Sequence, residues 1–229
     1  MTQGLFITFE GLEGAGKSTQ AELLYKHLLR EGYAVKFTRE PGGTPIGEAV
    51  REVLLTTKHR DITPLCEVFL FAASRSQLVE QVIRPQLGEG AIVVCDRYYD
   101  ATLAYQGWGR GVPPNQIRDI NDMCSWGVRP DLTFLLDIEP ARGLDRIRVR
   151  SIEAIQPIDR IESYDLAFHE RVREGYLAIA QDEPGRFRVL DGSLDPVTLN
   201  EIVVRVTMKE VQKRLPDPRR LRYDTSGLQ

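Results

Sequence analysis

The residue types between positions 11 and 19 form a pattern that can hold phosphate groups. The run is Gly11, Leu12, Glu13, Gly14, Ala15, Gly16, Lys17, Ser18 and Thr19. Its glycines allow the backbone to curl so that successive N–H groups face inward, and Lys17 can reach the outer phosphates. The Ser18 hydroxyl can take a position on Mg²⁺. We therefore expect these nine residues to hold a nucleoside triphosphate.

The elements around this loop have the order that phosphate binding requires. An apolar, strand-like run, Leu5 to Phe9, precedes the loop, and the helical pattern of Ser18 to Arg30 follows it. The N-terminal dipole of such a helix favours anions. An ordinary glycine turn is the alternative. The loop alone does not identify the molecule that accepts the phosphate.

A second polar pair follows another apolar run. Asp96 and Arg97 come directly after Ala91 to Cys95, and the carboxyl ends of buried parallel strands open toward ligands. Asp96 can orient Mg²⁺-bound water or an arginine, and Arg97 can bind the phosphate of an anionic acceptor through two hydrogen bonds. A structural surface ion pair is the alternative. Asp137, which also ends an apolar run, is the alternative metal-binding acid.

Two pairs at helical spacing offer contacts to a nucleobase. Phe71 and Arg75 are four residues apart, so one helix face presents a ring beside a guanidinium donor. Thr102 and Gln106 have the same spacing, and the Gln106 amide has both donor and acceptor groups for the edge of a base. Packing in the core is the alternative for Phe71 and for Tyr105.

Alternating strands and helices predict an α/β fold of three layers, with a central five-stranded parallel sheet flanked by helices. The expected strands are Leu5–Phe9, Ala34–Thr38, Ala91–Cys95, Leu132–Ile138 and Phe187–Leu190. Further helices are expected at Pro45–Leu55, Pro64–Leu87, Pro113–Cys124, Pro140–Arg150, Ser163–Gln181 and Asp195–Arg214. The runs 91–95 and 132–136 are nearly continuous in apolar residues, which places them in the middle of the sheet.

The pattern indicates one domain over residues 1–212, with a lid at about 146–162. The lid region is rich in arginine and is interrupted by Ala-Ile-Gln-Pro, which indicates a helix that runs into a mobile loop. Residues 213–229 form a polar C-terminal tail that we expect to be flexible. A partner-binding arm is the alternative for the tail.

The composition of the chain limits the classes of function that it can have. The 229 residues are 42% hydrophobic, which supplies a full core, and the net charge of −3 gives no basic signature for nucleic acid. The longest apolar runs are too short to cross a bilayer. Cys66, Cys95 and Cys124 lack any CxxC spacing, which fits a reducing compartment, so we expect a cytoplasmic location.

Switches, motors and small-molecule kinases all use such a loop. A guanine-specific switch needs NKxD after a late strand, and the chain has none; the DxxG match at 182–185 lies at a helix end near the C-terminus. Motors usually place paired acids after a central strand, where this chain has Asp96 and Arg97. Phosphoryl transfer to an anionic acceptor is therefore favoured. An ATP-dependent switch or motor with a macromolecular partner is the alternative from another class.

Five segments make the chain resemble the bacterial thymidylate kinases over nearly its whole length, apart from the tail. They are FEGLEGAGKST from Phe9, TREPGGT from Thr38, FAASR from Phe71, DRYYDATLAYQG from Asp96 and RPDLTFLLD from Arg129. The resemblance implies a P-loop kinase fold with a lid, transfer of the γ-phosphoryl group of ATP to dTMP with Mg²⁺, and a homodimer. Another nucleoside monophosphate kinase or a deoxynucleoside kinase is the alternative within this class.

The resemblance also implies roles at matching positions. Phe71 would stack on thymine, and Arg75 would donate to its O4, which disfavours cytosine. Tyr105 would pack where a ribose 2′-hydroxyl would sit. Thr102 and Gln106 belong to the same binding set for dTMP.

Around the acceptor phosphate and sugar, the resemblance implies four further roles. Arg51 and Arg97 match residues that hold the phosphate, and Glu13 matches an acid near the 3′-hydroxyl. Glu40 is a weaker match, whose role would be to fix Arg97 or metal-bound water.

The sequence does not identify a single catalytic arginine. Some relatives have a loop arginine at or beside position 13, and this chain has none there. We expect the basic group from the lid, at Arg146 or Arg150, which share a helix face, followed by Arg160. A solvated charged helix face is the alternative for each. The lid is longer around Glu153–Pro157 than in common versions.

Overall fold

A computed structural model describes residues 4–153 and 158–215 of the chain. Its strands are β1 (Leu5–Gly11), β2 (Val35–Arg39), β3 (Ile92–Asp96), β4 (Leu132–Asp137) and β5 (Phe187–Asp191). They form one five-stranded sheet in the order β2-β3-β1-β4-β5, in which every neighbouring pair is parallel. The five expected strands and the parallel sheet are confirmed.

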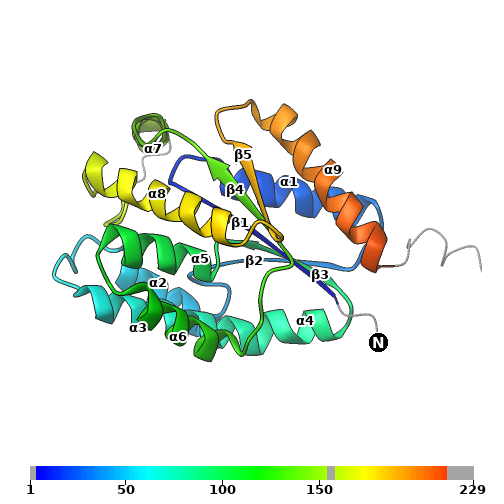
Figure 1. The fold of residues 1–229 in the computed structure, drawn as a ribbon, viewed down its shortest axis with the longest axis horizontal. Helices are drawn as coiled ribbons and strands as arrows, with labels where there is room; N and C mark the ends of the chain where they lie inside the picture. Colours follow the sequence, from blue (N-terminus) through cyan, green and yellow to red (C-terminus); the bar gives the residue numbers. More distant parts are fainter. Residues whose placement is uncertain (1–3, 154–157, 216–229) are drawn as a thin grey trace, which may run out of the picture.

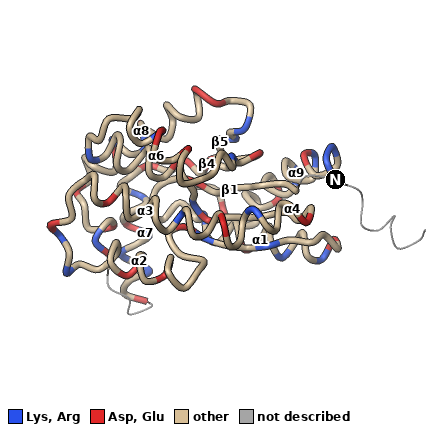
Figure 2. The backbone as a smooth tube through the Cα atoms, turned by 90° about the horizontal axis from the view of Figure 1, so that it is seen from below, with Lys and Arg blue, Asp and Glu red and all other residues tan. Residues whose placement is uncertain are grey.

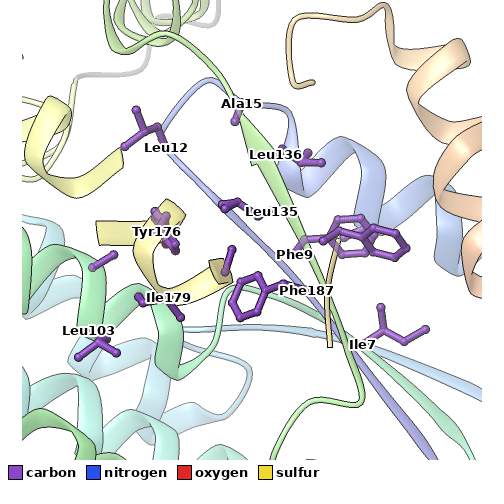
Figure 3. Packing of buried hydrophobic residues seen from close by; sticks show 14 of the residues in the cluster. Ile7, Phe9, Leu12, Ala15, Leu103, Leu135, Leu136, Tyr176, Ile179 and Phe187 are labelled. Atoms are coloured by element: carbon purple, nitrogen blue, oxygen red, sulfur yellow. The ribbon is translucent and has the colours of Figure 1, made fainter. Parts of the chain in front are cut away.

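Burial explains the strand order. Every residue of the central strand β1 is buried, and β3 and β4 beside it are buried except at their final aspartates. The edge strands β2 and β5 are only partly buried. Continuous apolar runs suit strands that are covered on both faces. The ring of Phe9 stacks on Phe134 with 5.1 Å between centroids, within the hydrophobic cluster of Figure 3.

Helices cover both faces of the sheet (Figure 1). The helical segments are α1 (Lys17–Arg30), α2 (Pro45–Leu55), α3 (Pro64–Leu78), the π-helix η1 (Val79–Ile83), α4 (Arg84–Gly88), α5 (Tyr99–Thr102), the π-helix η2 (Leu103–Gly109), α6 (Pro114–Ser125), α7 (Pro140–Glu153), α8 (Leu166–Asp182) and α9 (Pro196–Arg214). Helices α1 and α9 pack together over one face. On the other face, Phe6 packs with η1, and Glu10 meets Tyr176 of α8.

Two helical expectations need correction. The expected helix 64–87 is α3 followed by the π-helical turn η1 and then α4. Pro85 cannot donate a backbone hydrogen bond, and a π-helical turn accommodates such a break in the ladder. The segment 99–109 forms α5 and η2, which are not among the expected helices, although the spacing of Thr102 and Gln106 fits a helix. Most of its residues are buried and it contains Gly107 and Gly109, so it lacks an amphipathic signature.

The lid and the tail are described in part. Helix α7 continues to Glu153, and residues 154–157 of the expected lid lie outside the described residues. Helix α9 continues to Arg214, so the first two residues expected in the tail are helical, and residues 216–229 are not described. Charges of both signs are interspersed along the backbone (Figure 2). Over the described ranges, no helix is long and apolar enough to cross a membrane.

Candidate active site

The phosphate-binding loop joins β1 to α1 and makes very close backbone contacts. Gly11 has a φ of +136°, and a Cβ on it would lie 2.4 Å from the carbonyl oxygen of Leu136 in β4. Gly14 has a φ of +73°, and a Cβ there would lie 2.3 Å from the carbonyl oxygen of Gly143 in α7. Both positions therefore need glycine. The loop is held between β4 and α7 at the carboxyl end of β1.

A cavity of about 570 Å³, which we call the site cavity, lies beside this loop. The sequence-predicted residues that line it are Glu13, Gly14, Gly16, Lys17, Ser18 and Thr19 in the loop, Asp96 and Arg97 after β3, Glu40 after β2, Arg51 in α2, Phe71 in α3, Tyr105 and Gln106 in η2, and Arg146 and Arg150 in α7. Segments that are far apart in the sequence thus meet around one space.

Within the described residues, five expected site positions lie outside the cavity lining, apart from the alternatives Asp137 and Arg160. Gly11, Leu12 and Ala15 belong to the loop, and the side chains of Leu12 and Ala15 are buried in the hydrophobic core. Arg75 and Thr102 are 0% and 1% exposed, and Nη2 of Arg75 donates to the Thr102 hydroxyl at 2.7 Å. In this structure these two side chains therefore contact each other in the cavity wall, and their expected role in binding a base stays a prediction.

Ser18 and Asp96 form an oxygen pair that suits Mg²⁺. The Ser18 hydroxyl donates to Oδ2 of Asp96 at 2.5 Å, while Oδ1 of Asp96 is buried with no hydrogen-bond partner among the described residues. Hydroxyl and carboxylate oxygens are ligands that Mg²⁺ takes, together with water and substrate phosphates. No group of three or more His, Cys, Asp or Glu side chains in the described part of the chain could hold a metal. Ser18 and Asp96 are therefore the candidate residues for holding an ion beside the loop.

Asp137, the alternative metal acid, is engaged elsewhere. Nε and Nη2 of Arg173 donate to its two carboxylate oxygens at 2.7 and 2.9 Å. Asp137 is not among the residues that line the site cavity. The geometry thus places Asp96, and not Asp137, beside the loop hydroxyl.

Lys17 is almost fully buried at the start of α1. Its Nζ donates to the carbonyl oxygen of Leu12 at 2.6 Å. Burial, together with the charge of Arg97, lowers the pKa of Lys17 from 10.5 to about 8, and nearby carboxylates oppose this shift. The cation is therefore poorly solvated, and the negative charge of a bound phosphate would stabilise it.

Arg97 is held in one orientation by a set of acceptors. Its φ of 70° lies in the left-handed region, which is uncommon for a residue with a side chain. Nη1 donates to the Gly11 carbonyl and to the Tyr176 hydroxyl, both at 3.0 Å. Nη2 donates to Glu13 at 2.8 Å and to the Tyr105 hydroxyl at 3.1 Å. A phosphate that binds Arg97 would therefore use its Nε–H or replace one of the tyrosines.

Glu13 connects the loop to this cluster. The Tyr105 hydroxyl donates to the Glu13 carboxylate at 2.6 Å, and Nδ1 of His169 lies 3.5 Å from Oε2. Burial works against the charged form, but Arg97, His169, Lys17 and Tyr105 together outweigh it and hold the pKa of Glu13 well below its usual range. The loop thus presents a carboxylate on the side of the cavity that faces Tyr105.

The Glu40 carboxylate pairs with Arg75, and no contact of the described residues joins it to Arg97. The alternative role of Glu40, fixing metal-bound water, stays a prediction. Nε of Arg75 donates to Oε2 of Glu40 at 3.0 Å, and Nη2 donates to Oε1. Both side chains are buried, and burial raises the pKa of Glu40 although Arg75 opposes the rise. Arg97 instead turns toward the loop after β1, where Gly11 and Glu13 accept its hydrogen bonds.

The lid arginines differ in their surroundings. Nη1 of Arg146 donates to the loop carbonyl of Gly14 at 3.0 Å. Arg150 forms an ion pair with Glu162 at 2.5 Å, and both arginines line the site cavity. Arg160 is 3% exposed, and its Nε donates to the backbone of α2 at 2.9 Å. Arg160 therefore anchors the C-terminal part of the expected lid to α2 and does not line the cavity.

Two buried acids beside the site, Glu10 and Glu67, are not among the site residues expected from the sequence. Glu10 accepts from the Tyr98 N–H at 2.7 Å and from the Tyr176 hydroxyl at 2.8 Å. Glu67, in the first turn of α3, accepts from Gln106 at 2.5 Å. The only sequence signal for the two acids is a charge inside an otherwise apolar strand or helix face, since charged residues are rarely fully buried unless paired.

The fold and the site together define a P-loop kinase. The parallel sheet, the glycine loop at the end of β1 and the acidic and basic residues after β3 all meet at one cavity. A family model described as thymidylate kinase matches residues 9–202.

Named relatives and a solved structure agree with this match. The chain is 53% identical over 193 residues to the thymidylate kinase of Deinococcus radiodurans, which covers 84% of this chain and 91% of the relative. It is 48% identical over 215 residues to that of Nitratidesulfovibrio vulgaris strain DP4, with 93% and 94% covered. The crystal structure of thymidylate kinase from Ehrlichia chaffeensis matches with a TM-score of 0.72 and 34% identity, over 90% of this chain and 99% of that chain. The chain belongs to the thymidylate kinase family and is accordingly an enzyme that phosphorylates dTMP.

Proposed function

We propose that this member of the thymidylate kinase family passes the γ-phosphoryl group of ATP, in the presence of Mg²⁺, directly to the phosphate of dTMP, giving dTDP. The observation that carries the proposal is that the phosphate loop with Lys17 and the side chains of Arg51, Arg97 and Phe71 line one cavity. The loop and Lys17 suit a polyphosphate, and the two arginines with Phe71 suit an anionic nucleotide. No covalent intermediate is required, since positioning and charge neutralisation can drive in-line transfer.

On the donor side, the loop N–H groups and Lys17 would bind the outer phosphates of ATP. Ser18 and Asp96 would hold Mg²⁺, which when bound neutralises phosphate charge. Arg146 and Arg150 line the same cavity from α7 and are the candidates for the arginine nearest the transferring group. Since Arg150 is paired with Glu162, its use would require that ion pair to open.

On the acceptor side, Arg51 is the better placed direct ligand for the dTMP phosphate. In the contacts of the described residues, Arg51 uses only Nη1, which donates to the Pro41 carbonyl at 3.0 Å. The positive charge of Arg97 would lie near the dTMP phosphate that Arg51 binds. The Phe71 ring would stack on the base, and Tyr105 with Glu13 would face the sugar and leave little room for a 2′-hydroxyl.

One assay tests the proposal. Purified protein is incubated with ATP, Mg²⁺ and, separately, dTMP, dUMP, dCMP, UMP and thymidine, and the product phosphates are resolved. We expect dTDP from dTMP, with a modest preference over dUMP because one methyl group is worth about 1–3 kcal/mol in a fitted pocket. The proposal fails if dTMP gives no dTDP or reacts no better than dCMP. ATP hydrolysis stimulated by a macromolecule, without use of dTMP, would favour a switch or motor.

The metal assignment has its own test. Asp96→Asn should raise the Mg²⁺ concentration that gives half-maximal activity, because a carboxylate is lost beside Ser18. Asp137→Asn is the matched control, since Asp137 also ends a strand but does not line the site cavity. An unchanged Mg²⁺ requirement in Asp96→Asn would reject the assignment.

We further propose that the protein is a homodimer in the cytoplasm. Large apolar side chains are exposed on two helices that pack together, namely Ile46 and Val53 on α2 and Leu65 and Phe69 on α3, with Phe69 55% exposed. The three cysteines are free thiols, as a reducing compartment would keep them. Light scattering should give twice the 26.0 kDa chain mass, and Phe69→Asp should give the monomer. A wild-type monomer would reject the dimer.

A further inference from the structure

Gln106 has an unsatisfied acceptor in the wall of the site cavity. Its side chain is 1% exposed, and its Nε2 donates to Oε1 of Glu67 at 2.5 Å. Its Oε1 is buried and accepts no hydrogen bond from any described residue, although Gln106 lines the cavity. Buried acceptors without a donor are rare in folded proteins, and each needs an explanation such as an absent ligand.

Glu67 fixes the orientation of this amide. It is 1% exposed, and its Oε2 lies 2.5 Å from Nη1 of Arg110 and 2.7 Å from Nη2 of Arg160. A carboxylate between two guanidinium groups accepts hydrogen bonds and donates none. Gln106 therefore faces it with the NH₂ group, because the reversed amide would set two oxygens against each other.

We propose that Glu67 is a positioning residue that sets the base preference of this chain. By holding Nε2 of Gln106, it leaves Oε1 as an acceptor for a nucleobase with a ring N–H. Thymine and uracil carry such a donor at N3, whereas N3 of cytosine carries a lone pair, so cytosine would meet the acceptor of Gln106 with another acceptor. The inference rests on the proposed function, because it takes the base of a nucleoside monophosphate to lie in the site cavity.

The first experiment compares Glu67→Gln with the wild type, using dTMP and dCMP as acceptors. The amide introduced at position 67 can donate, so Gln106 is free to reverse and present its NH₂ group to N3 of cytosine. We expect the ratio of kcat/KM for dTMP to that for dCMP to fall at least about tenfold, with KM for ATP unchanged. A parallel loss for both acceptors, with the ratio unchanged, would show a merely structural role and overturn the inference.

Arg110→Gln is the matched control. It removes one ion pair of Glu67 but keeps the carboxylate that holds Gln106. We expect this variant to lose thermal stability while its dTMP to dCMP ratio stays that of the wild type. A ratio that falls as far as in Glu67→Gln would overturn the inference, since loss of stability alone would then explain it.

If Glu67→Gln does not fold, a second measurement tests whether Oε1 of Gln106 accepts a hydrogen bond from the ring N–H of the base. N3-methyl-dTMP lacks the ring N–H, and we expect the wild type to use it at least about tenfold less well than dTMP. Gln106→Met keeps the length of the side chain without its acceptor and should lose this difference. A difference that persists in Gln106→Met would be steric and would overturn the inference. A wild type that makes no dTDP from dTMP would reject the proposed function as well.

Discussion

Arg97 and Glu13 form an ion pair at the wall of the site cavity, with 2.8 Å between Nη2 and Oε1. The two side chains are 17% and 12% exposed, so the pair is largely shielded from solvent and its charges interact more strongly than on an open surface. The pair joins the turn after β3 to the loop after β1. The position of the Arg97 guanidinium therefore depends on the phosphate loop itself.

Replacing this arginine tests that dependence. Arg97→Lys keeps one positive charge but loses the planar fork that reaches Gly11, Glu13 and two tyrosines. Since one preorganised donor in an active site is worth about 3–4 kcal/mol, we expect kcat/KM for dTMP to fall by at least about a hundredfold. Steady-state kinetics with dTMP as the varied substrate provide the measurement. Arg173→Lys, at an ion pair outside the cavity lining, should retain wild-type kinetics.

Lys17→Ala should abolish transfer while the fold remains intact. The side chain makes one hydrogen bond, to Leu12, and its cation is costly to bury, so its removal should leave the free energy of unfolding unchanged or higher. We expect dTDP formation to fall by at least about a hundredfold, measured beside urea unfolding. Lys26→Ala, at an exposed ion pair of the same helix, is the control. Turnover near the wild-type rate in Lys17→Ala would contradict the assigned role.

The buried pair of Glu40 and Arg75 should contribute strongly to stability. Glu40→Ala leaves the Arg75 guanidinium buried beside Asn121 and Thr102 without its carboxylate. Breaking such a pair costs about 3–5 kcal/mol, which urea unfolding would detect. The double variant Glu40→Leu with Arg75→Met should recover much of this loss, because no unpaired charge remains. Glu80→Ala, at an exposed ion pair with Arg84, should cost at most about 1 kcal/mol.

Glu10 should make stability depend on pH. Burial, reinforced by Asp100, raises its pKa from 4.5 to about 8, although Arg97 and the hydrogen bonds from Tyr176 and Tyr98 oppose the rise. Between these two values the folded chain binds a proton that the unfolded chain has lost. This contribution is complete below about pH 4.5 and disappears as the pH rises through about 8. The free energy of unfolding should therefore decrease over that range.

Glu10→Gln should show a weaker decrease of unfolding free energy with pH than the wild type. Urea unfolding at pH 5 and at pH 8 measures the difference. Glu22→Gln, which changes an exposed acid of α1, should keep the wild-type dependence. Equal slopes in Glu10→Gln and the wild type would mean that Glu10 is ionised throughout the range.

The local pattern of residue types along the chain predicts the inner strands and the phosphate loop of this protein. Continuous apolar runs identified β3 and β4 as inner strands, because only strands covered on both faces tolerate them. The sequence also predicts the glycine loop, with its lysine and serine, because their chemistry depends on residues that are adjacent in the chain. The helical segment 99–109 was missed, since burial on most sides removes the periodic signal.

The pairing of the buried charges was decided by tertiary structure alone. Glu40 meets Arg75 across 35 positions, Glu67 meets Arg110 across 43, and Glu13 meets Arg97 across 84. Spacing along a helix or strand fixes only the directions of nearby side chains. Which acid meets which cation depends on how α3, η2 and the loop pack around the sheet, and burial then makes an unpaired charge too costly to keep. The sequence by itself therefore determined the phosphate chemistry, and the packing decided which residues hold the acceptor side in place.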